Sequence, residues 1–154
     1  DFEGGGSIEG LGLLPVSTVL AGDKRTVQFS GRVCDPSGIF SPLAGLEVEG
    51  YEIHMGRTTR CVKDAEDTRD FTTDGTGVCL GDVYGTYVHG FFDKGAIASS
   101  VVEALADRKG IKISSCEAED HRDFKEKEYD RLADNLRKHL DMDLIYAMLR
   151  EASI

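Results

Sequence analysis

Apolar and polar residues alternate along the first part of the chain, a pattern typical of half-buried β-strands. Residues 11–21 are apolar and rich in branched side chains, and residues 25–33 alternate between apolar and polar types. We expect two strands joined at Gly22 and Asp23. Pro15 places the first of them at an edge or a bend of its sheet.

The strand pattern continues in two stretches separated by a polar segment. Residues 46–54 alternate, residues 63–76 are poor in apolar side chains, and residues 78–92 are again apolar. We therefore expect strands on either side of an exposed, mobile loop. Three glycines interrupt the last stretch, which indicates that something approaches its backbone closely. They are Gly81, Gly85 and Gly90.

Helical spacing replaces the strand pattern after residue 92. Ile97, Val101 and Leu105 recur every four residues, which predicts a helix. Asp93 is placed to cap its start, and Gly110 to close its end in the left-handed conformation.

Two further helices are expected towards the end of the chain. Residues 117–139 are highly charged but carry apolar side chains at helical spacing, which indicates one amphipathic helix with a solvated face. Asp141 is placed to cap a final helix, and residues 111–115 are expected to form a short strand. Strands followed by helices predict an α/β or α+β layered fold.

Length and charge limit the class of protein. The 154 residues suffice for one domain, strand-rich over residues 8–92 and helical over residues 93–154. A net charge of −10 disfavours nucleic acid and anionic membrane surfaces as partners. No apolar run is long enough for a transmembrane helix.

The four cysteines form no C-x-x-C pair, so they give no sign of a zinc or redox site. They are Cys34, Cys61, Cys79 and Cys116. We expect free thiols, a cytoplasmic protein and no bound metal. The chain opens at Asp1 without a methionine, which we interpret as a cut inside a longer protein.

Two histidines stand in segments bracketed by glycines. His54 belongs to the segment GYEIHMG, and His89 to the segment GTYVHG. His89 follows a predicted strand and precedes a helix, which is the sheet edge where ligands bind in open α/β folds. A histidine there is suited to act as a general base, although a hydrogen-bonded histidine at a strand end is the commoner case.

These segments, in this order, resemble the C-terminal glutamine amidotransferase domain of the cobyric acid synthase family. The resemblance also rests on the block IEGLGLLP, which begins at Ile8, and on EYDRLA and LDMD near the end of the chain. It covers nearly the whole chain. It implies the C-terminal portion of a flavodoxin-like, class I α/β domain with a mixed sheet and C-terminal helices.

The resemblance also implies a reaction. A cysteine thiolate attacks the side-chain amide of glutamine, and a histidine, here His89, moves the proton. His54 and Glu52 belong to the second family segment and are less direct site residues. The ammonia would pass to an N-terminal synthetase domain of the same parent chain, which uses ATP and Mg²⁺ to amidate the corrinoid adenosylcobyrinic acid a,c-diamide in cobalamin biosynthesis. We expect no cofactor on this chain itself.

The sequence departs from the family pattern in two respects. Phe91 stands two residues after His89, where triad-type relatives carry the orienting carboxylate. The nucleophile of the family lies in a glycine-rich elbow shortly before the region where this chain begins. We therefore expect this chain to lack the catalytic cysteine and to be inactive by itself.

Cys79 is the alternative nucleophile that the sequence offers, because residues 77–81 fit the G-x-C-x-G spelling of an elbow. An elbow needs a strand before the cysteine and a helix after it. Here a polar loop precedes Cys79 and a strand follows, so a buried strand cysteine is the expectation. A thiol hydrolase would need Cys79 and His89 within hydrogen-bonding reach.

Two other functions stay open: the related cobyrinic acid a,c-diamide synthase, and a non-catalytic binding or regulatory domain of the same fold. Substrate turnover by the parent protein separates the first from cobyric acid synthase. An elbow motif upstream in the parent reading frame would decide for an enzyme, whereas a native start near Asp1 would favour the binding domain.

Overall fold

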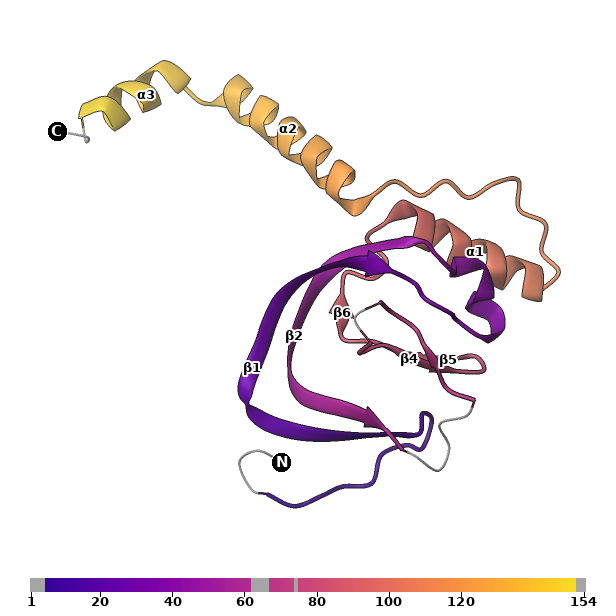
Figure 1. Ribbon diagram of the computed structural model, residues 1–154. Helices are drawn as coiled ribbons and strands as arrows, with labels where there is room; N and C mark the ends of the chain where they lie inside the picture. The colour runs from indigo at the N-terminus through magenta and orange to yellow at the C-terminus, as the bar shows by residue number, and fades with distance from the viewer. Residues whose placement is uncertain (1–4, 62–66, 74, 152–154) are drawn as a thin grey trace. The chain divides into compact units, whose positions relative to one another are not determined.

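Figure 1 shows the computed structural model, in which residues 5–61, 67–73 and 75–151 are described. The chain forms two compact units, Asp1–Glu119 and Asp120–Ile154. All the described strands lie in the first unit, and the last two helices form the second. The fold is therefore of mixed α and β type, with strands first and helices last.

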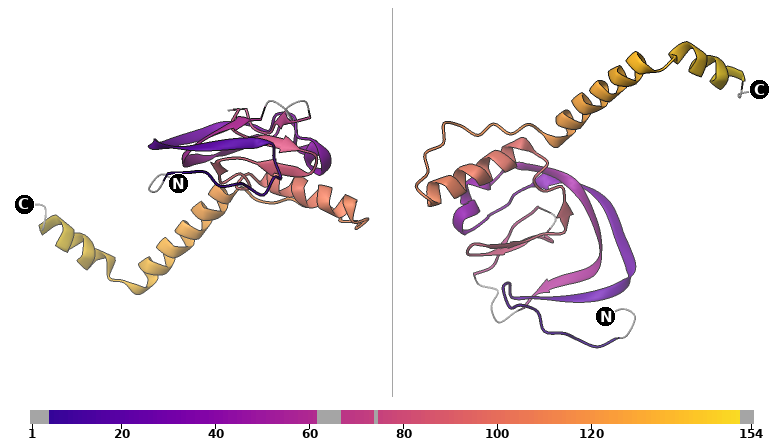
Figure 2. Two further views of the ribbon diagram at one scale, coloured as in Figure 1. Left: turned by 90° about the horizontal axis from the view of Figure 1, so that it is seen from below. Right: turned by 180° about the vertical axis from the view of Figure 1, so that it is seen from behind.

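A long antiparallel ribbon frames the first unit and curves around its interior (Figures 1 and 2). It consists of β1 (Val16–Arg32) and β2 (Glu47–Arg60), which pair along nearly their whole length. The register shifts between Leu20 and Arg25. The prediction of two strands joined at Gly22 and Asp23 is therefore wrong: both halves of β1 pair with the same strand, so the chain bulges there without reversing.

The remaining strands are short. β6 (Val88–His89) pairs with the free side of β2 and completes a sheet of order β1-β2-β6. A second sheet has the order β3-β4-β5, from β3 (Arg69–Asp70), β4 (Val78–Leu80) and β5 (Val83–Gly85). Figure 1 shows the β4–β5 hairpin inside the curve of the ribbon.

The pairs between the described strands are all antiparallel, so the expected mixed sheet is not observed. Parallel strands require a crossover connection between them, usually a helix. In the first unit α1 (Gly95–Arg108) could serve as one, but residues 111–115 form no strand after it. The prediction of a strand at residues 111–115 is therefore wrong. Without a strand after it, α1 does not connect two parallel strands.

A single core joins the two sheets, α1 and the 3-10 helix η1 (Gly38–Leu43). Leu43 and Ile97 are fully buried in it. The other buried core residues are Phe29, Val33, Val48, Phe71, Cys79, Val88 and Phe91.

The polar segment before β4 is only partly the exposed loop that its composition predicts. Of its described residues, 67, 69, 70, 73 and 75 are exposed, whereas 68, 71 and 72 are buried; residues 62–66 and 74 lie outside the described residues. Thr68 and Thr72 are buried, and Phe71 stacks on Phe91 with ring centroids 5.1 Å apart. One aromatic side chain and the pairing of β3 with β4 are enough to anchor this segment, although its overall composition is polar.

Helix α1 confirms the predicted helix, and its end is closed by Gly110 in the left-handed region at φ 66°. Its start differs from the prediction. The N-cap position is Lys94, and not Asp93. The backbone N–H of Asp93 donates a hydrogen bond to the carbonyl oxygen of Gly90 in a turn before the helix. Gly95 lies so close to the carbonyl of Ala118 that a Cβ atom would overlap it.

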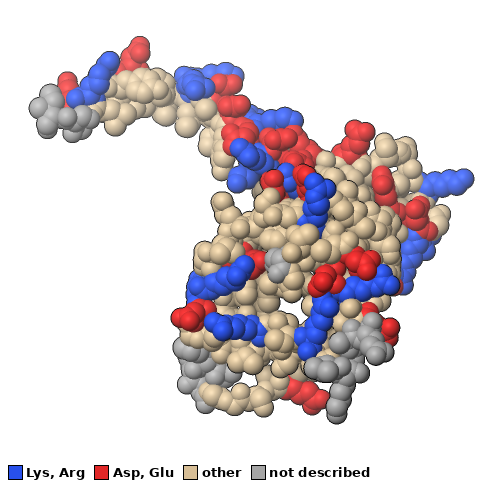
Figure 3. Space-filling view, in the orientation of Figure 1, with Lys and Arg blue, Asp and Glu red and all other residues tan. Residues whose placement is uncertain are grey.

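The second unit contains α2 (His121–His139) and α3 (Met142–Glu151), which confirm the two predicted C-terminal helices. The Asp141 carboxylate accepts a hydrogen bond from the Leu144 N–H at 3.0 Å, as expected of a cap. Acidic and basic side chains mix along α2 (Figure 3). In the described part of the chain, no helix combines the length and the apolar character needed to cross a membrane.

Asp82, in the turn between β4 and β5, links three elements of the first unit. Its carboxylate accepts a hydrogen bond from the Ile39 N–H of η1 at 2.7 Å and one from the Arg108 guanidinium of α1 at 2.6 Å. These two donors, first the amide and then the guanidinium, hold the pKa of Asp82 below its ordinary value of 3.8. The turn, η1 and the end of α1 are thereby held together by one ionised group.

Replacing this carboxylate should weaken the fold in a pH-dependent way. A group whose pKa is lower in the folded chain adds stability above its unfolded pKa and loses it as the pH falls through the folded pKa. We expect Asp82→Asn to lower the melting temperature at pH 7 and the difference from the wild type to vanish in strong acid. Asp107→Asn, on the exposed surface of α1, is the matched control; thermal melts at several pH values that show equal losses for both variants would contradict this role.

Candidate functional site

His89 lies on β6, directly opposite Tyr51 of β2. The imidazole is solvent-exposed and stacks on the Tyr51 ring, with centroids 5.1 Å apart and an angle of 9° between the planes. It makes no hydrogen bond to another described residue. Phe91, at the place of the missing carboxylate, is buried in the core. The ring of Tyr51, and not an acidic side chain, is therefore the stacking partner of the His89 imidazole.

Glycines allow the backbone around His89 to approach its neighbours. A Cβ atom on Gly50 would overlap the carbonyl oxygen of His89, and one on Gly85 would lie 2.9 Å from a methyl group of Leu14. Gly90 has a left-handed φ of 83°. The predicted close approach is confirmed at Gly85 and at Gly90, where a Cβ atom would lie 2.9 Å from a carboxylate oxygen of Asp93. Gly81 has open space around it and serves instead as a left-handed turn residue at φ 57°.

The other predicted site residues form a cluster on β2. The Glu52 side chain is fully buried, and its Oε2 accepts a hydrogen bond from Arg25 Nε at 2.7 Å and lies 3.2 Å from His54 Nε2. His54 Nδ1 donates to the carbonyl oxygen of Gly56 at 2.8 Å. Glu52 Oε1 has no hydrogen-bond partner among the described residues. Both nitrogens of His54 therefore face oxygen atoms.

The two histidines lie on opposite faces of the β1-β2-β6 sheet. Tyr51 is paired with His89 and both are exposed, whereas Glu52 is paired with Val88 and both are buried. Side chains alternate between the faces of a strand, so His54 shares the buried face with Glu52. The structure thus brings His54 and Glu52 together and separates them from His89.

Cys79 is buried in β4, which confirms the expectation of a buried strand cysteine. Its Sγ lies 3.7 Å from the carbonyl oxygen of Asp35 and 3.8 Å from the Ser37 hydroxyl. Neither contact involves His89, which belongs to the other sheet. Over the described residues, no group of three His, Cys, Asp or Glu side chains is placed to hold a metal ion.

The first unit contains a pocket of about 460 Å³ beside His54. Its lining includes the bulge of β1, residues 54–58 of β2, and Tyr87. Sequence reasoning missed Lys24, Arg25, Arg57 and Tyr87 as site residues. The register shift in β1 is what brings its bulge beside His54, and no local pattern in the sequence signals that shift.

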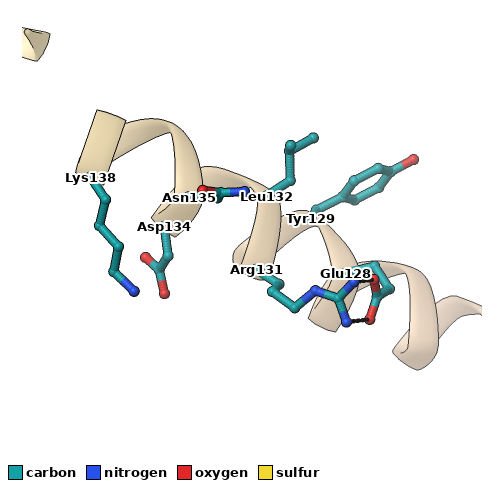
Figure 4. A pocket seen from close by; sticks show the side chains of 7 residues that line it. All are labelled: Glu128, Tyr129, Arg131, Leu132, Asp134, Asn135 and Lys138. Atoms are coloured by element: carbon teal, nitrogen blue, oxygen red, sulfur yellow. Dashed lines mark hydrogen bonds and ion pairs between the residues drawn. The ribbon is translucent and has the colours of Figure 1, made fainter. Parts of the chain in front are cut away.

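A larger hollow of about 710 Å³ lies on the second unit (Figure 4). Its lining comes from α2 alone, and it includes the ion pair of Arg131 with Glu128 at 3.1 Å. One helix supplies one wall, so the hollow is an open surface and not an enclosed site. The pocket beside His54, which is built from several segments, is the better candidate for ligand binding.

Comparison with known proteins identifies the class. Residues 1–97, more than half of the chain, match the CobB/CobQ-like glutamine amidotransferase domain, and the chain belongs to this family. The two glycine-bracketed histidines lie inside the matched region.

The relatives are more specific. Cobyric acid synthase of Lachnoclostridium phytofermentans is 40% identical over 97% of this chain and 32% of its own length. Cobyric acid synthase of Dehalococcoides mccartyi strain CBDB1 is 40% identical over 94% of this chain, and that of Citrobacter koseri is 36% identical over 95%. The chain spans about a third of the length of these relatives.

The absence of a side chain at Gly50 should be necessary for the position of His89. In Gly50→Ala the new methyl group would collide with the His89 carbonyl, so β6 must move. We expect the free energy of unfolding to fall by about 1–3 kcal/mol, as for an overpacked site. The NMR signals of Val88 and His89 should shift as well.

Gly10→Ala is the matched control, because its Cβ would have open space around it. It should change the free energy of unfolding by less than about 1 kcal/mol. Equal denaturant midpoints for Gly50→Ala and Gly10→Ala, with unmoved β6 signals, would show that the close approach is unimportant.

Proposed function

We propose that this chain is part of a cobyric acid synthase-like glutamine amidotransferase, in which His89 is the proton-transferring catalytic residue. The family match and the relatives support the class of reaction. The observation that carries the choice of residue is the placement of His89. It is the exposed family histidine at a strand end, whereas both nitrogens of His54 are already engaged.

The proposed chemistry is the hydrolysis of glutamine to glutamate and ammonia. A cysteine thiol loses its proton to His89, and the thiolate attacks the side-chain carboxamide carbon. The protonated histidine returns the proton to the leaving nitrogen, so ammonia departs and a thioester remains. Water, deprotonated by the same imidazole, then cleaves the thioester and releases glutamate.

The nucleophile in this proposal comes from outside residues 1–154. Cys79 is fully buried and its described contacts do not include His89, so it is poorly placed to react. The complete domain would have the flavodoxin-like α/β fold, to which these antiparallel sheets contribute one part. The longer relatives leave room for the remaining part.

Tyr51 is proposed as the positioning residue for His89. Its ring lies nearly parallel to the imidazole, and the carboxylate used by triad-type enzymes is replaced by the buried Phe91. Stacking restricts the tilt of the imidazole but accepts no proton from it. The histidine can therefore face the thiol with one nitrogen while the other contacts solvent.

The parent protein is proposed to be cytoplasmic and to deliver the ammonia to a synthetase domain. There, ATP and Mg²⁺ would support amidation of adenosylcobyrinic acid a,c-diamide. As part of this proposal we assign ATP and Mg²⁺ to that synthetase domain, and no step of their chemistry to this chain.

Substitution of His89 in the parent protein tests the proposed role. We expect His89→Ala to reduce glutamine-dependent amidation by roughly 10²–10⁴-fold, the usual contribution of a general acid–base group. Amidation with added ammonium salts should persist, because free ammonia bypasses the amidotransferase site.

His139→Ala is the matched control, since His139 is exposed at the end of α2 and bonds only its own helix backbone among the described residues. It should leave both activities unchanged. Loss of the ammonia-dependent reaction in His89→Ala would indicate a structural role, and full glutamine-dependent activity would refute the assignment.

The chain of residues 1–154 alone should release no glutamate from glutamine. The proposed reaction needs a nucleophile that this chain does not supply. A coupled glutamate assay on the purified chain measures this directly. Glutamate release that disappears in both Cys79→Ser and His89→Ala would instead establish a thiol hydrolase built on these two residues.

A further inference from the structure

We propose that a proton held between His54 and Glu52 locks β6 onto β2, so that loss of this proton at alkaline pH loosens the strand that carries His89. The lock consists of three contacts of the His54 imidazole, with Glu52, Gly56 and Tyr87. Each contact is stronger when both ring nitrogens carry protons. The device concerns the conformation of β6 and does not rest on the proposed amidotransferase role.

Both ring nitrogens of His54 face hydrogen-bond acceptors. Nδ1 lies 2.8 Å from the carbonyl oxygen of Gly56, and Nε2 lies 3.2 Å from Glu52 Oε2. A neutral imidazole has one N–H group and one lone pair, so it can donate to only one of these oxygens and would direct its lone pair at the other. An imidazolium has two N–H donors and satisfies both contacts. The geometry therefore fits the doubly protonated ring.

The shared proton belongs to the imidazole and not to the carboxyl group. Glu52 Oε2 also accepts a hydrogen bond from Arg25 Nε at 2.7 Å. A guanidinium stays protonated in proteins, and its strong hydrogen bonds are made to ionised carboxylates. Glu52 is thus the anion of the cluster, and Arg25 and His54 are the two donors that approach its Oε2 atom.

Burial makes this proton important. The Glu52 side chain is fully buried and that of His54 is 13% exposed, so solvent cannot readily replace a lost contact. Glu52 Oε1 has no hydrogen-bond partner among the described residues, which leaves the contacts at Oε2 to stabilise the charge. Removing one partner of a buried ion pair is strongly unfavourable. A deprotonated Nε2 would face the carboxylate with its lone pair, and the ring of His54 would have to move.

The ring of Tyr87 connects His54 to the strand β6. The two rings stack with centroids 3.9 Å apart and an angle of 11° between their planes. A cation at this distance over the face of a tyrosine ring is attracted by its π-electrons, so protonation of His54 strengthens the stack. The Tyr87 hydroxyl is hydrogen-bonded to Thr58 Oγ1 of β2 at 2.6 Å. A fixed His54 therefore holds Tyr87 against β2.

β6 depends on these side-chain contacts because it is only two residues long, Val88–His89. Two backbone pairs join it to β2: Val88 opposite Glu52, and His89 opposite Tyr51. Val88 is buried, and Tyr87 directly precedes it. Movement of the cluster formed by His54 and Glu52 would disturb both Tyr87 and Val88, and the disturbance would reach His89 through the backbone.

Three further charged residues line the pocket beside His54; they are Asp23, Lys24 and Arg57. Among the described contacts of His54, none involves these side chains. The charges of Asp23 and Lys24, both in the bulge of β1, oppose each other. Arg57 is an odd number of positions from His54 along β2, which turns it to the other face of the strand. Glu52 is therefore the carboxylate that governs the protonation of His54.

The protons on the His54 ring can be observed directly by NMR of the ¹⁵N-labelled wild-type chain. At about pH 6, where histidines are largely protonated, we expect two ring N–H signals from His54, because both protons are hydrogen-bonded and shielded from solvent. At about pH 9 one of them should be lost. A single ring N–H signal at the lower pH would overturn the proposal. This measurement needs no substitution, so it does not depend on how a variant folds.

The effect on β6 is measured in a His89→Gln background, because the imidazole of His89 itself titrates. Between about pH 6 and pH 9 the amide signals of Tyr87 and Val88 should shift in His89→Gln. The shift should be absent when His54→Gln is added, since glutamine does not titrate there. His139→Gln is the matched control; His139 is exposed on α2, and its addition to His89→Gln should leave the shift unchanged.

Two outcomes of this pH series would contradict the lock. Amide signals of Tyr87 and Val88 that stay in place as His54 loses its proton would show that the proton does not act on β6. Equal shifts with and without His54→Gln would assign the effect to another group. Thermal melts at about pH 6 establish that each variant is folded. An inactive or active amidotransferase site would change none of these results, because they are read from the conformation alone.

Discussion

The central position of β2 determines where both candidate sites lie. This strand pairs with β1 on one side and with β6 on the other, and its side chains alternate between a buried and an exposed face. The pairing with β6 places His89 against Tyr51 on the exposed face. The pairing with β1 brings Arg25 to Glu52 on the buried face. One strand therefore supports two chemically different surfaces.

Burial of Glu52 depends on its neighbours. An isolated buried carboxylate would be strongly unfavourable, and here Arg25 and His54 both approach the same oxygen. The contact with Glu52 in turn fixes the imidazole of His54, which becomes part of the pocket wall and not a free base. The exposed His89 keeps its imidazole nitrogens unengaged by the described residues. Burial, more than the glycine-bracketed motif that both share, distinguishes the two histidines.

Sequence reasoning predicted the elements that depend on local patterns. The helices at the C-terminal end, the Asp141 cap and the left-handed Gly110 follow from spacing and capping, and they are confirmed. The single long β1 was missed because the shift between Leu20 and Arg25 is set by pairing with a distant strand. The pocket depends on that same shift, so Lys24 and Arg25 could not be recognised in advance. The burial of Phe71 was also missed, because its contacts with the rings of Tyr84 and Phe91 outweigh the polar composition of the segment.

The number of residues between Tyr51 and His54 has a consequence of its own. The two side chains are an odd number of positions apart, so they point to opposite faces of β2. Loss or gain of a single residue between them would turn His54 towards the solvent, or force the pairing with β6 to slip and carry His89 out of place. A change of length here would move one of the two histidines out of its present surroundings while the other stays in place, an effect that no single side-chain replacement can reproduce.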